Sequence, residues 1–320
     1  MEWGMHHLML IAALITPTHS VTQIIKKKVT ISNPHYYQSH ESIPHPPITI
    51  WIHGTRFIRR PLYNNFFKGI PSLKLAQDLA SDYHLYQIAK TLNKTAPQAF
   101  PMETFYLFGW SGKIRIHDRI EAADILYKEI QRIVTEYQNK YHRYPDIRII
   151  GHSHGGNVAL YLGKMKQSAD ESIYIKELIL LACPVQESTK KYVADDIFEK
   201  TYAFYSTLDV VQVIAPQVVY NVHRTKRGNL RTEMKWNFLS GRCFDHHARL
   251  AQVKIKVNGR ALFHTEFSRP KFIGLLPHIL HVVNSWDVDY THPPETSKLL
   301  CVYTRKEQKI NERRSRVRAQ

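Results

Sequence analysis

A G-H-S-H-G-G motif at residues 151–156 places Ser153 between two glycines, the G-x-S-x-G arrangement of a nucleophilic serine. The motif directly follows the apolar run 147–150 and precedes the buried-helix pattern 158–162. In this context the serine occupies a sharp, strained turn between a strand and a helix, and the small glycines let those two elements approach closely. The pattern predicts that Ser153 is a nucleophile.

A serine hydroxyl is a poor nucleophile until a histidine takes its proton, and a carboxylate must orient that histidine. The expected chain order around this motif is serine, acid and histidine. Asp209 follows the apolar run 202–205, the second predicted strand after the serine, so it should lie at the carboxyl end of that strand. We therefore predict Asp209 as the acid. Its alternative role is a turn or a helix cap, and the rival acids, Asp195 and Asp196, precede the strand.

The base has to be chosen among 19 histidines. His264 is the first histidine after the run 253–257, which we interpret as the last strand, and it precedes the helical stretch 270–282. This place in the chain order predicts that His264 is the base. Four histidines are weaker candidates, because they precede the strand or lie in the later helix: His246, His247, His278 and His281.

The negative charge that develops on an attacked carbonyl oxygen needs two hydrogen-bond donors. One is expected to be the backbone N–H of His154, directly after the nucleophile. The other is expected after an early strand, where the run 48–52 leads into His53, Gly54 and Thr55. We predict the backbone N–H of Thr55 as this second donor, with Gly54 letting the backbone come close to the substrate. An ordinary strand-ending turn is the alternative for His53 and Gly54.

Five short apolar runs have the length of strands that are buried on both faces of a parallel sheet: 48–52, 105–108, 147–150, 178–182 and 202–205. Between them, the region 118–141 has apolar residues at helical spacing. The alternation predicts an α/β fold with a mostly parallel, doubly wound sheet flanked by helices. Residues 253–257 alternate between apolar residues and lysines, which predicts a strand with one wet face near the sheet edge.

We predict three parts along the chain: an N-terminal segment at 1–45, an α/β domain at 46–290 and a basic C-terminal tail at 291–320. Residues 1–20 contain a candidate signal peptide, although no Lys or Arg precedes its apolar run. Within the domain, residues 210–247 are expected to form a cap over the site, and an ordinary excursion between strands is the alternative. The cap is expected to bind an acyl group through apolar side chains: Val218, Val219, Tyr220, Trp236 and Phe238.

The formal net charge of +17 arises from 44 Lys and Arg residues against 27 Asp and Glu residues. Basic clusters lie at 26–28, between residues 224 and 231, and in the C-terminal tail. Such a surface attracts polyanions, including anionic membranes, and a merely solvated basic surface is the alternative. Since no nucleic-acid-binding motif accompanies the charge, nucleic acid is not an expected partner.

Three cysteines, Cys183, Cys243 and Cys301, are too few for a disulfide framework and form no C-x-x-C pair. This usage favours a reducing, cytoplasmic compartment over export. The sequence has no H-E-x-x-H or Cys/His zinc spacing, no G-x-G-x-x-G and no phosphate-loop motif. We therefore expect neither a metal nor another cofactor. The oligomeric state is left open.

These motifs together resemble the α/β-hydrolase superfamily, particularly its lipases and esterases. The resemblance covers residues 48–282 and rests on H-G-T at 53–55, on the serine motif, and on Asp209 and His264 in the right order. G-W-S-G at 109–112, followed by Arg119 on a predicted helix, is also similar to lipases. The residue after the serine is His154, where many relatives carry Leu, Met or Gln, so the shape of the acyl pocket is in question.

The resemblance implies a cofactor-free serine hydrolase that cleaves a carboxylic ester, thioester or amide through an acyl-enzyme. A small-molecule or lipid ester is the implied substrate class. The alternative is a catalytically silent scaffold of the same fold that binds an acidic partner or an anionic membrane through its basic surface. The two differ in the reactivity of Ser153 toward a fluorophosphonate probe.

Overall fold

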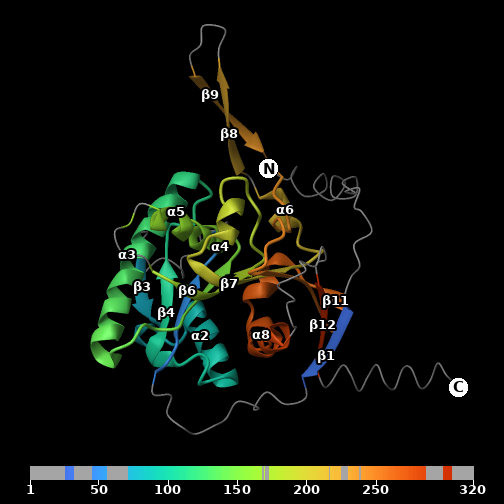
Figure 1. Cartoon of the computed structure of the whole chain (residues 1–320). Helices are drawn as coiled ribbons and strands as arrows, with labels where there is room; N and C mark the ends of the chain where they lie inside the picture. The colour runs from blue at the N-terminus through green and yellow to red at the C-terminus, as the bar shows by residue number, and fades with distance from the viewer. Residues whose placement is uncertain are drawn as a thin grey trace, which may run out of the picture.

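The centre of the fold is a mostly parallel sheet (Figure 1). The computed structural model describes residues 26–31, 45–55, 71–167, 169, 173–215, 217–224, 230–237, 239–285 and 298–304. The strands of the sheet are β1 (Lys26–Ile31), β2 (Ile48–Ile52), β3 (Ser72–Leu75), β4 (Phe105–Gly109), β5 (Ile147–His152), β6 (Ile175–Leu181), β7 (Phe198–Tyr205), β10 (Leu250–Val257), β11 (Arg260–Ala261) and β12 (Lys298–Thr304). Their order is β1-β12-β10-β7-β6-β5-β2-β4-β3, with β11 paired to β10. Only the β3–β4 and β10–β11 pairs of this sheet are antiparallel in the described part of the chain. The predicted α/β fold is therefore confirmed.

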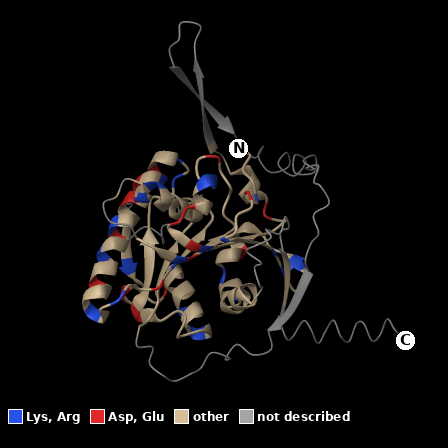
Figure 2. Ribbon diagram, viewed as in Figure 1, with Lys and Arg blue, Asp and Glu red and all other residues tan. Residues whose placement is uncertain are grey.

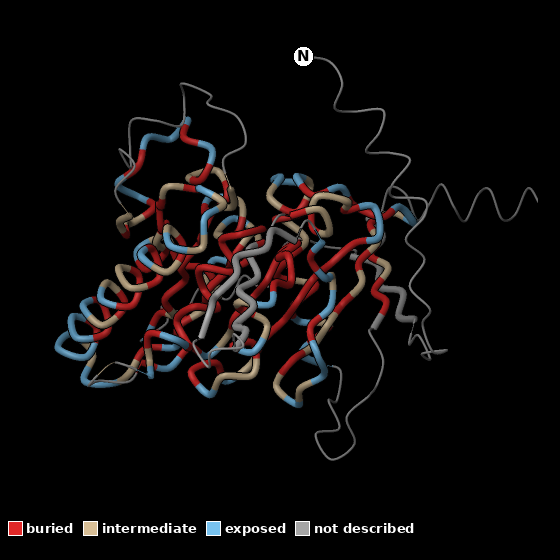
Figure 3. Tube along the Cα trace, turned by 90° about the horizontal axis from the view of Figure 1, so that it is seen from above, coloured by how far each residue is buried: buried red, intermediate tan, exposed pale blue. Residues whose placement is uncertain are grey.

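Both faces of the sheet are buried, which explains why its strands read as continuous apolar runs. In β6, Leu178 and Leu180 pack in one core cluster, whereas Ile179 and Leu181 pack in another, because successive side chains point to opposite faces. The first cluster includes side chains of α3 (Ile116–Tyr141), α4 (His154–Leu160) and α5 (Leu162–Lys166). The second includes side chains of α2 (His84–Thr95), α7 (Pro270–Ile273) and α8 (Leu276–Asn284). Figure 3 shows the buried residues gathered between these layers.

Strand β10 lies inside the sheet, between β7 and β12, so the prediction that residues 253–257 lie near the sheet edge is wrong. The alternation of this strand arises because its Val and Ile side chains are buried while Lys254 and Lys256 are only half-buried. The same run is not the last strand either, since β12 follows it in the chain. His264 is still the first histidine after β10.

The sheet extends beyond both limits of the predicted domain, 46 and 290. Strand β1 falls in the predicted N-terminal segment and β12 in the predicted tail, and the two strands pair in parallel. Their sequences, KKKVTI and KLLCVYT, combine lysines with short apolar stretches and give a weak local strand signal. Lysine is typical of edge strands, and β1 is an edge of this sheet.

The predicted helices are present with different bounds. The stretch 118–141 is part of α3, and the pattern 158–162 is divided between α4 and α5 at Tyr161. The stretch 270–282 consists of α7 and α8, which Gly274 and Leu275 separate. Along α3, acidic and basic residues are interspersed on the outside of the molecule (Figure 2), so this helix presents no surface of a single charge.

The region predicted as a cap contains α6 (Val210–Ile214) and the antiparallel pair β8 (Gln217–Arg224) and β9 (Leu230–Asn237). Its five predicted acyl-contacting side chains lie outside the described residues, as do residues 1–20, the tail after 304 and the side chains of the basic clusters. Within the described ranges, no helix has the length and hydropathy needed to cross a membrane. In the same ranges, no group of three or more His, Cys, Asp and Glu side chains could hold a metal ion.

Candidate active site

Ser153 lies in the sharp turn between the end of β5 and the start of α4. Its φ of 54° and ψ of −132° are angles that residues with a side chain rarely adopt, so the backbone is strained at this position. Two backbone hydrogen bonds hold the turn: Ser153 N donates to Leu181 O, and Gly156 N donates to Ser153 O, both at 2.9 Å. The strand-to-helix turn predicted from the motif is therefore present.

The glycines around Ser153 are required by close backbone packing. A Cβ on Gly155 would lie 2.5 Å from Ile52 O and 2.6 Å from His53 O. A Cβ on Gly54 would lie 2.8 Å from the Cβ of Ser153. These contacts bring residues 53–55 against the serine turn. We call this segment the predicted oxyanion loop, because the second oxyanion donor is expected to come from it.

We expect Gly155→Ala to destabilise the fold by about 2–3 kcal/mol, because the added methyl would meet two backbone oxygens that cannot rotate away. Urea denaturation of the variant and of wild type measures this difference. Gly241→Ala is the matched control, since its Cβ would lie 3.3 Å from the nearest atom, in the side chain of Val185. Equal unfolding free energies for the two variants would contradict the packing argument.

The structure brings Ser153, His264 and Asp209 together from three distant segments. The Nε2 of His264 lies 2.9 Å from Ser153 Oγ, and its Nδ1 lies 2.9 and 3.0 Å from the two carboxylate oxygens of Asp209. Because a carboxylate only accepts, Nδ1–H of His264 donates to Asp209, and Nε2 of the neutral ring is left as the acceptor that faces the hydroxyl. The geometry allows Ser153 to give its proton to His264 as it attacks.

Asp209 also caps a helix, which is the alternative role considered for it. Its Oδ1 accepts from the backbone N–H of Gln212 at 2.9 Å in the first turn of α6. Asp209 is 0% exposed, so the two N–H donors compensate much of the cost of burying its charge. Capping fixes the carboxylate toward His264, and the two roles are therefore compatible.

The rival residues lie elsewhere. Asp196 pairs with Lys166, and Asp195 accepts from the backbone N–H of Ile197. His264 is hydrogen-bonded to both Ser153 and Asp209, so the structure brings this histidine, rather than His246, His247, His278 or His281, into contact with the other two predicted residues.

The side chain of His152 contacts both the ring and the backbone carbonyl of His264. The ring of His152 packs on that of His264, with 5.1 Å between centroids, and its Nε2–H donates to His264 O at 3.2 Å. Burial lowers the pKa of His152 to about 3, with further lowering by His264 and His53. His152 is therefore neutral at neutral pH, and its hydrogen bond fixes the backbone of the residue that faces Ser153.

The lowered pKa of His152 predicts a loss of stability in acid. The unfolded chain binds a proton on this residue below pH 6.5, while the folded protein does not until pH falls to about 3, so stability decreases as pH falls through this window. Between pH 7.5 and 5.5, the contribution of His152 should decrease by about 1.4 kcal/mol. His152→Gln should remove this part of the pH dependence of the unfolding free energy in urea. Exposed His117→Gln is the control and should retain the wild-type dependence.

The predicted oxyanion loop is held by His53 and Trp110. Nδ1–H of His53 donates to Gly54 O at 2.7 Å, and its Nε2 accepts from the backbone N–H of Trp110 at 3.2 Å. The indole N–H of Trp110 donates back to His53 O at 2.8 Å. These bonds fix the backbone next to Thr55, and they assign a structural role to the G-W-S-G motif noted in the sequence.

A buried arginine lies behind His154. Arg119 is 0% exposed, and its Nη1 donates to His154 Nδ1 and to Gln186 Oε1, both at 2.7 Å. Burial, and then the Arg119 charge, hold the pKa of His154 well below its usual value, so the ring is neutral with its proton on Nε2. The burial of Arg119 could have been predicted from the sequence, because it lies about one helical turn before Ala122 and Ala123 on the buried face of α3.

One protein family matches the central part of the chain. A family model described as PGAP1-like alpha/beta domain matches residues 74–240, a span that contains Ser153 and Asp209 and ends before His264. No curated protein matches the sequence.

Two solved structures are similar at low identity. One is Est1E from Butyrivibrio proteoclasticus with bound ferulic acid, at 16% identity and a TM-score of 0.22, covering 44% of each chain. The chain thus matches less than half of that protein's length. The other, from Agrobacterium vitis S4, is described as a hydrolase and has 12% identity and a TM-score of 0.25, covering 86% of this chain and 90% of that one.

Proposed function

The chain belongs to the PGAP1-like alpha/beta domain family of the α/β-hydrolase superfamily, and from this premise we propose that it is a serine hydrolase of carboxylic esters. The observation that carries the proposal is the pair of hydrogen-bond distances that link Ser153 Oγ to His264 and His264 to Asp209. A serine hydroxyl, an imidazole and a buried carboxylate in this sequence of contacts form the arrangement that acyl transfer uses.

In the proposed reaction Ser153 Oγ attacks the ester carbonyl carbon while His264 Nε2 takes its proton. Asp209 stabilises the imidazolium that forms, and the backbone N–H groups of Thr55 and His154 bind the oxyanion, each such donor typically lowering the barrier by about 3 kcal/mol. The intermediate collapses when the alkoxide leaves with the proton from His264. Water, with His264 again as base, then releases the acid from the acyl-enzyme.

The Arg119 charge supports the same assignment. No described carboxylate forms an ion pair with this buried cation, and it contacts the ring of the residue whose N–H is the proposed oxyanion donor. An uncompensated positive charge in a water-poor interior favours negative charge nearby. The field behind α4 therefore acts in the direction that stabilises an oxyanion.

Two exposed apolar residues neighbour the proposed catalytic residues in the chain. Leu208 and Phe263 directly precede Asp209 and His264, and they are 42% and 55% exposed. We propose that the substrate has an apolar acyl group, because exposed apolar side chains gain from contact with a hydrocarbon chain.

A panel of p-nitrophenyl esters of increasing acyl length, followed by rapid mixing, tests the proposal. We expect a burst of p-nitrophenol close to one equivalent per protein, because the acyl-enzyme forms before water releases it. We also expect kcat/KM to rise from acetate to medium-chain esters. Hydrolysis without a burst, at equal rates for wild type and for protein with Ser153 blocked, would reject the proposed nucleophile.

A fluorophosphonate probe separates the enzyme from a catalytically silent scaffold. The probe should add its mass once, at Ser153, which peptide mapping can locate. An intact mass that the probe leaves unchanged would favour the scaffold, whose basic surface would then be its functional part.

A further inference from the structure

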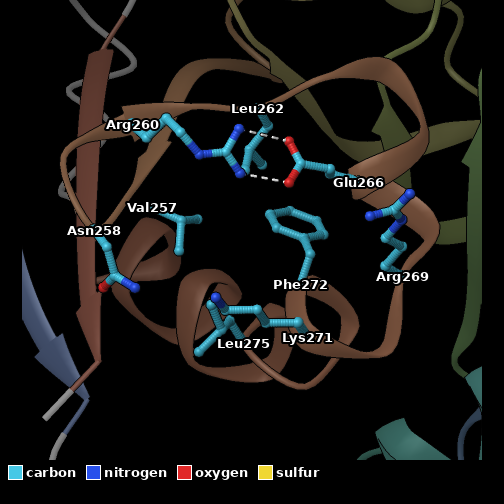
Figure 4. A pocket seen from close by; sticks show the side chains of 9 residues that line it. All are labelled: Val257, Asn258, Arg260, Leu262, Glu266, Arg269, Lys271, Phe272 and Leu275. Atoms are coloured by element: carbon cyan, nitrogen blue, oxygen red, sulfur yellow. Dashed lines mark hydrogen bonds and ion pairs between the residues drawn. The ribbon is translucent and has the colours of Figure 1, made fainter. Parts of the chain in front are cut away.

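A pocket lies beside the segment that carries His264 (Figure 4). It is formed at the end of β10, by β11, by the 3-10 turn His264–Ser268 and by α7. Its volume is about 450 Å³, within the range of small-molecule sites. None of Ser153, Asp209 and His264 lines it, so it is separate from the candidate active site.

The charged side chains of this pocket carry an excess of positive charge. The two guanidinium nitrogens of Arg260 donate to the two carboxylate oxygens of Glu266 at 2.5 and 3.1 Å, which leaves this pair neutral overall. Arg269 and Lys271 also line the pocket and are exposed, and neither forms an ion pair with a described carboxylate. Two positive charges are therefore available to a ligand.

Apart from Asn258, the rest of the lining is apolar. Val257, Leu262 and Phe272 are each less than 10% exposed and, with Leu275, they line the pocket. Figure 4 shows the ring of Phe272 standing between α7 and the Arg260–Glu266 pair, with Val257 beside it. A ligand in the pocket would therefore meet both apolar side chains and cationic groups.

We propose that this pocket binds a small amphiphilic anion, namely a phosphate or carboxylate group on an apolar body. The positive charges of Arg269 and Lys271 attract the anionic group, and the apolar body packs against Leu275. A neutral hydrocarbon would leave both charges unpaired, and inorganic phosphate would leave the apolar lining uncovered. The anion has two sources, a soluble molecule or the headgroup of a lipid.

The test should leave Arg260 and Glu266 intact, because Glu266 Oε2 also accepts from the backbone N–H of Phe263 at 2.8 Å, next to His264. Arg269→Ala/Lys271→Ala is therefore the pocket variant. Arg143→Ala/Lys164→Ala is the control, since it removes one exposed Arg and one exposed Lys that do not line the pocket.

Titration calorimetry with octyl phosphate on the full chain measures the affinity. We expect the pocket variant to bind at least about tenfold more weakly than wild type, and the control variant to bind like wild type. Octanol and inorganic phosphate should each bind wild type at least about tenfold more weakly than octyl phosphate does. Equal affinities for wild type and pocket variant, or equal affinities for octyl phosphate and octanol, would overturn the proposal.

Two further experiments identify the source of the anion and show whether binding is independent of catalysis at Ser153. Retention on phosphatidylcholine vesicles that contain phosphatidic acid, lost in the pocket variant, identifies a lipid headgroup as the source, while binding of octyl phosphate alone identifies a soluble ligand. Ser153→Ala protein keeps the pocket and should bind octyl phosphate like wild type. The outcome for the pocket is therefore distinguishable from the outcome for the proposed hydrolase activity.

Discussion

Replacement of Ser153 by alanine is expected to lower kcat for ester hydrolysis by about 10⁴- to 10⁶-fold, because no other hydroxyl is placed 2.9 Å from His264 Nε2 in the described part of the chain. The strained turn should remain, since alanine experiences the same φ of 54° as serine. Thermal unfolding of the variant should therefore stay close to that of wild type, and only the steady-state rate should change.

Two comparisons make the Ser153→Ala result specific. Ser285→Ala removes an exposed hydroxyl at the end of α8 and should retain full activity. Ser153→Gly should lose activity like the alanine variant but gain stability of about 1 kcal/mol, because glycine adopts positive φ without strain. More than a tenth of wild-type kcat in Ser153→Ala would exclude Ser153 as the nucleophile.

The second large effect is expected for Asp209→Asn, which should lower kcat by about 10⁴-fold. The asparagine amide can donate to Nδ1 of His264, and this favours the tautomer whose Nε2 carries the proton and cannot accept from Ser153. The side-chain oxygen of asparagine can still accept from the Gln212 N–H, so the cap of α6 is kept. Fold stability should therefore change much less than the rate, which separates the two roles of this residue.

Asp195→Asn is the matched control for this variant. Asp195 was the rival acid in the sequence and accepts a comparable backbone hydrogen bond, from Ile197 N at 3.0 Å. Its variant should keep wild-type kcat. Similar rates for Asp195→Asn and Asp209→Asn, measured with one ester substrate, would show that the carboxylate of Asp209 has no special part in the reaction.

Local sequence predicted the central strands well because they are buried on both faces. β2, β5 and β6 carry apolar side chains at most of their buried positions, and such runs are recognisable without knowledge of their neighbours. The glycines at 151 and 155 were equally readable, since backbone approach to within 3 Å of an added Cβ excludes any other residue. The strand signal depends on residue types within a few positions, whereas the contacts that require Gly155 come from Ile52 O and His53 O.

The edge of the sheet could not be read in the same way. β1 begins with three lysines, β12 is a short apolar stretch after one lysine, and they become strands because they pair with each other and, through β12, with β10. The position of β10 inside the sheet follows from that pairing alone. Hydrogen bonds between segments distant in the chain leave little trace in either local sequence.

By itself, the sequence determined the central strands, the helices that alternate with them, the turn at Ser153 and the candidates Asp209 and His264, because each depends on local residue types or on chain order. Only the tertiary structure decided which of 19 histidines faces the serine. It also decided that Asp209 can cap α6 and orient His264 at once, that Arg119 lies buried behind His154, and that Arg260, Arg269 and Lys271 surround one pocket. The physical reason is that side-chain distances across a fold are set by the packing of whole elements, and a linear pattern records none of them.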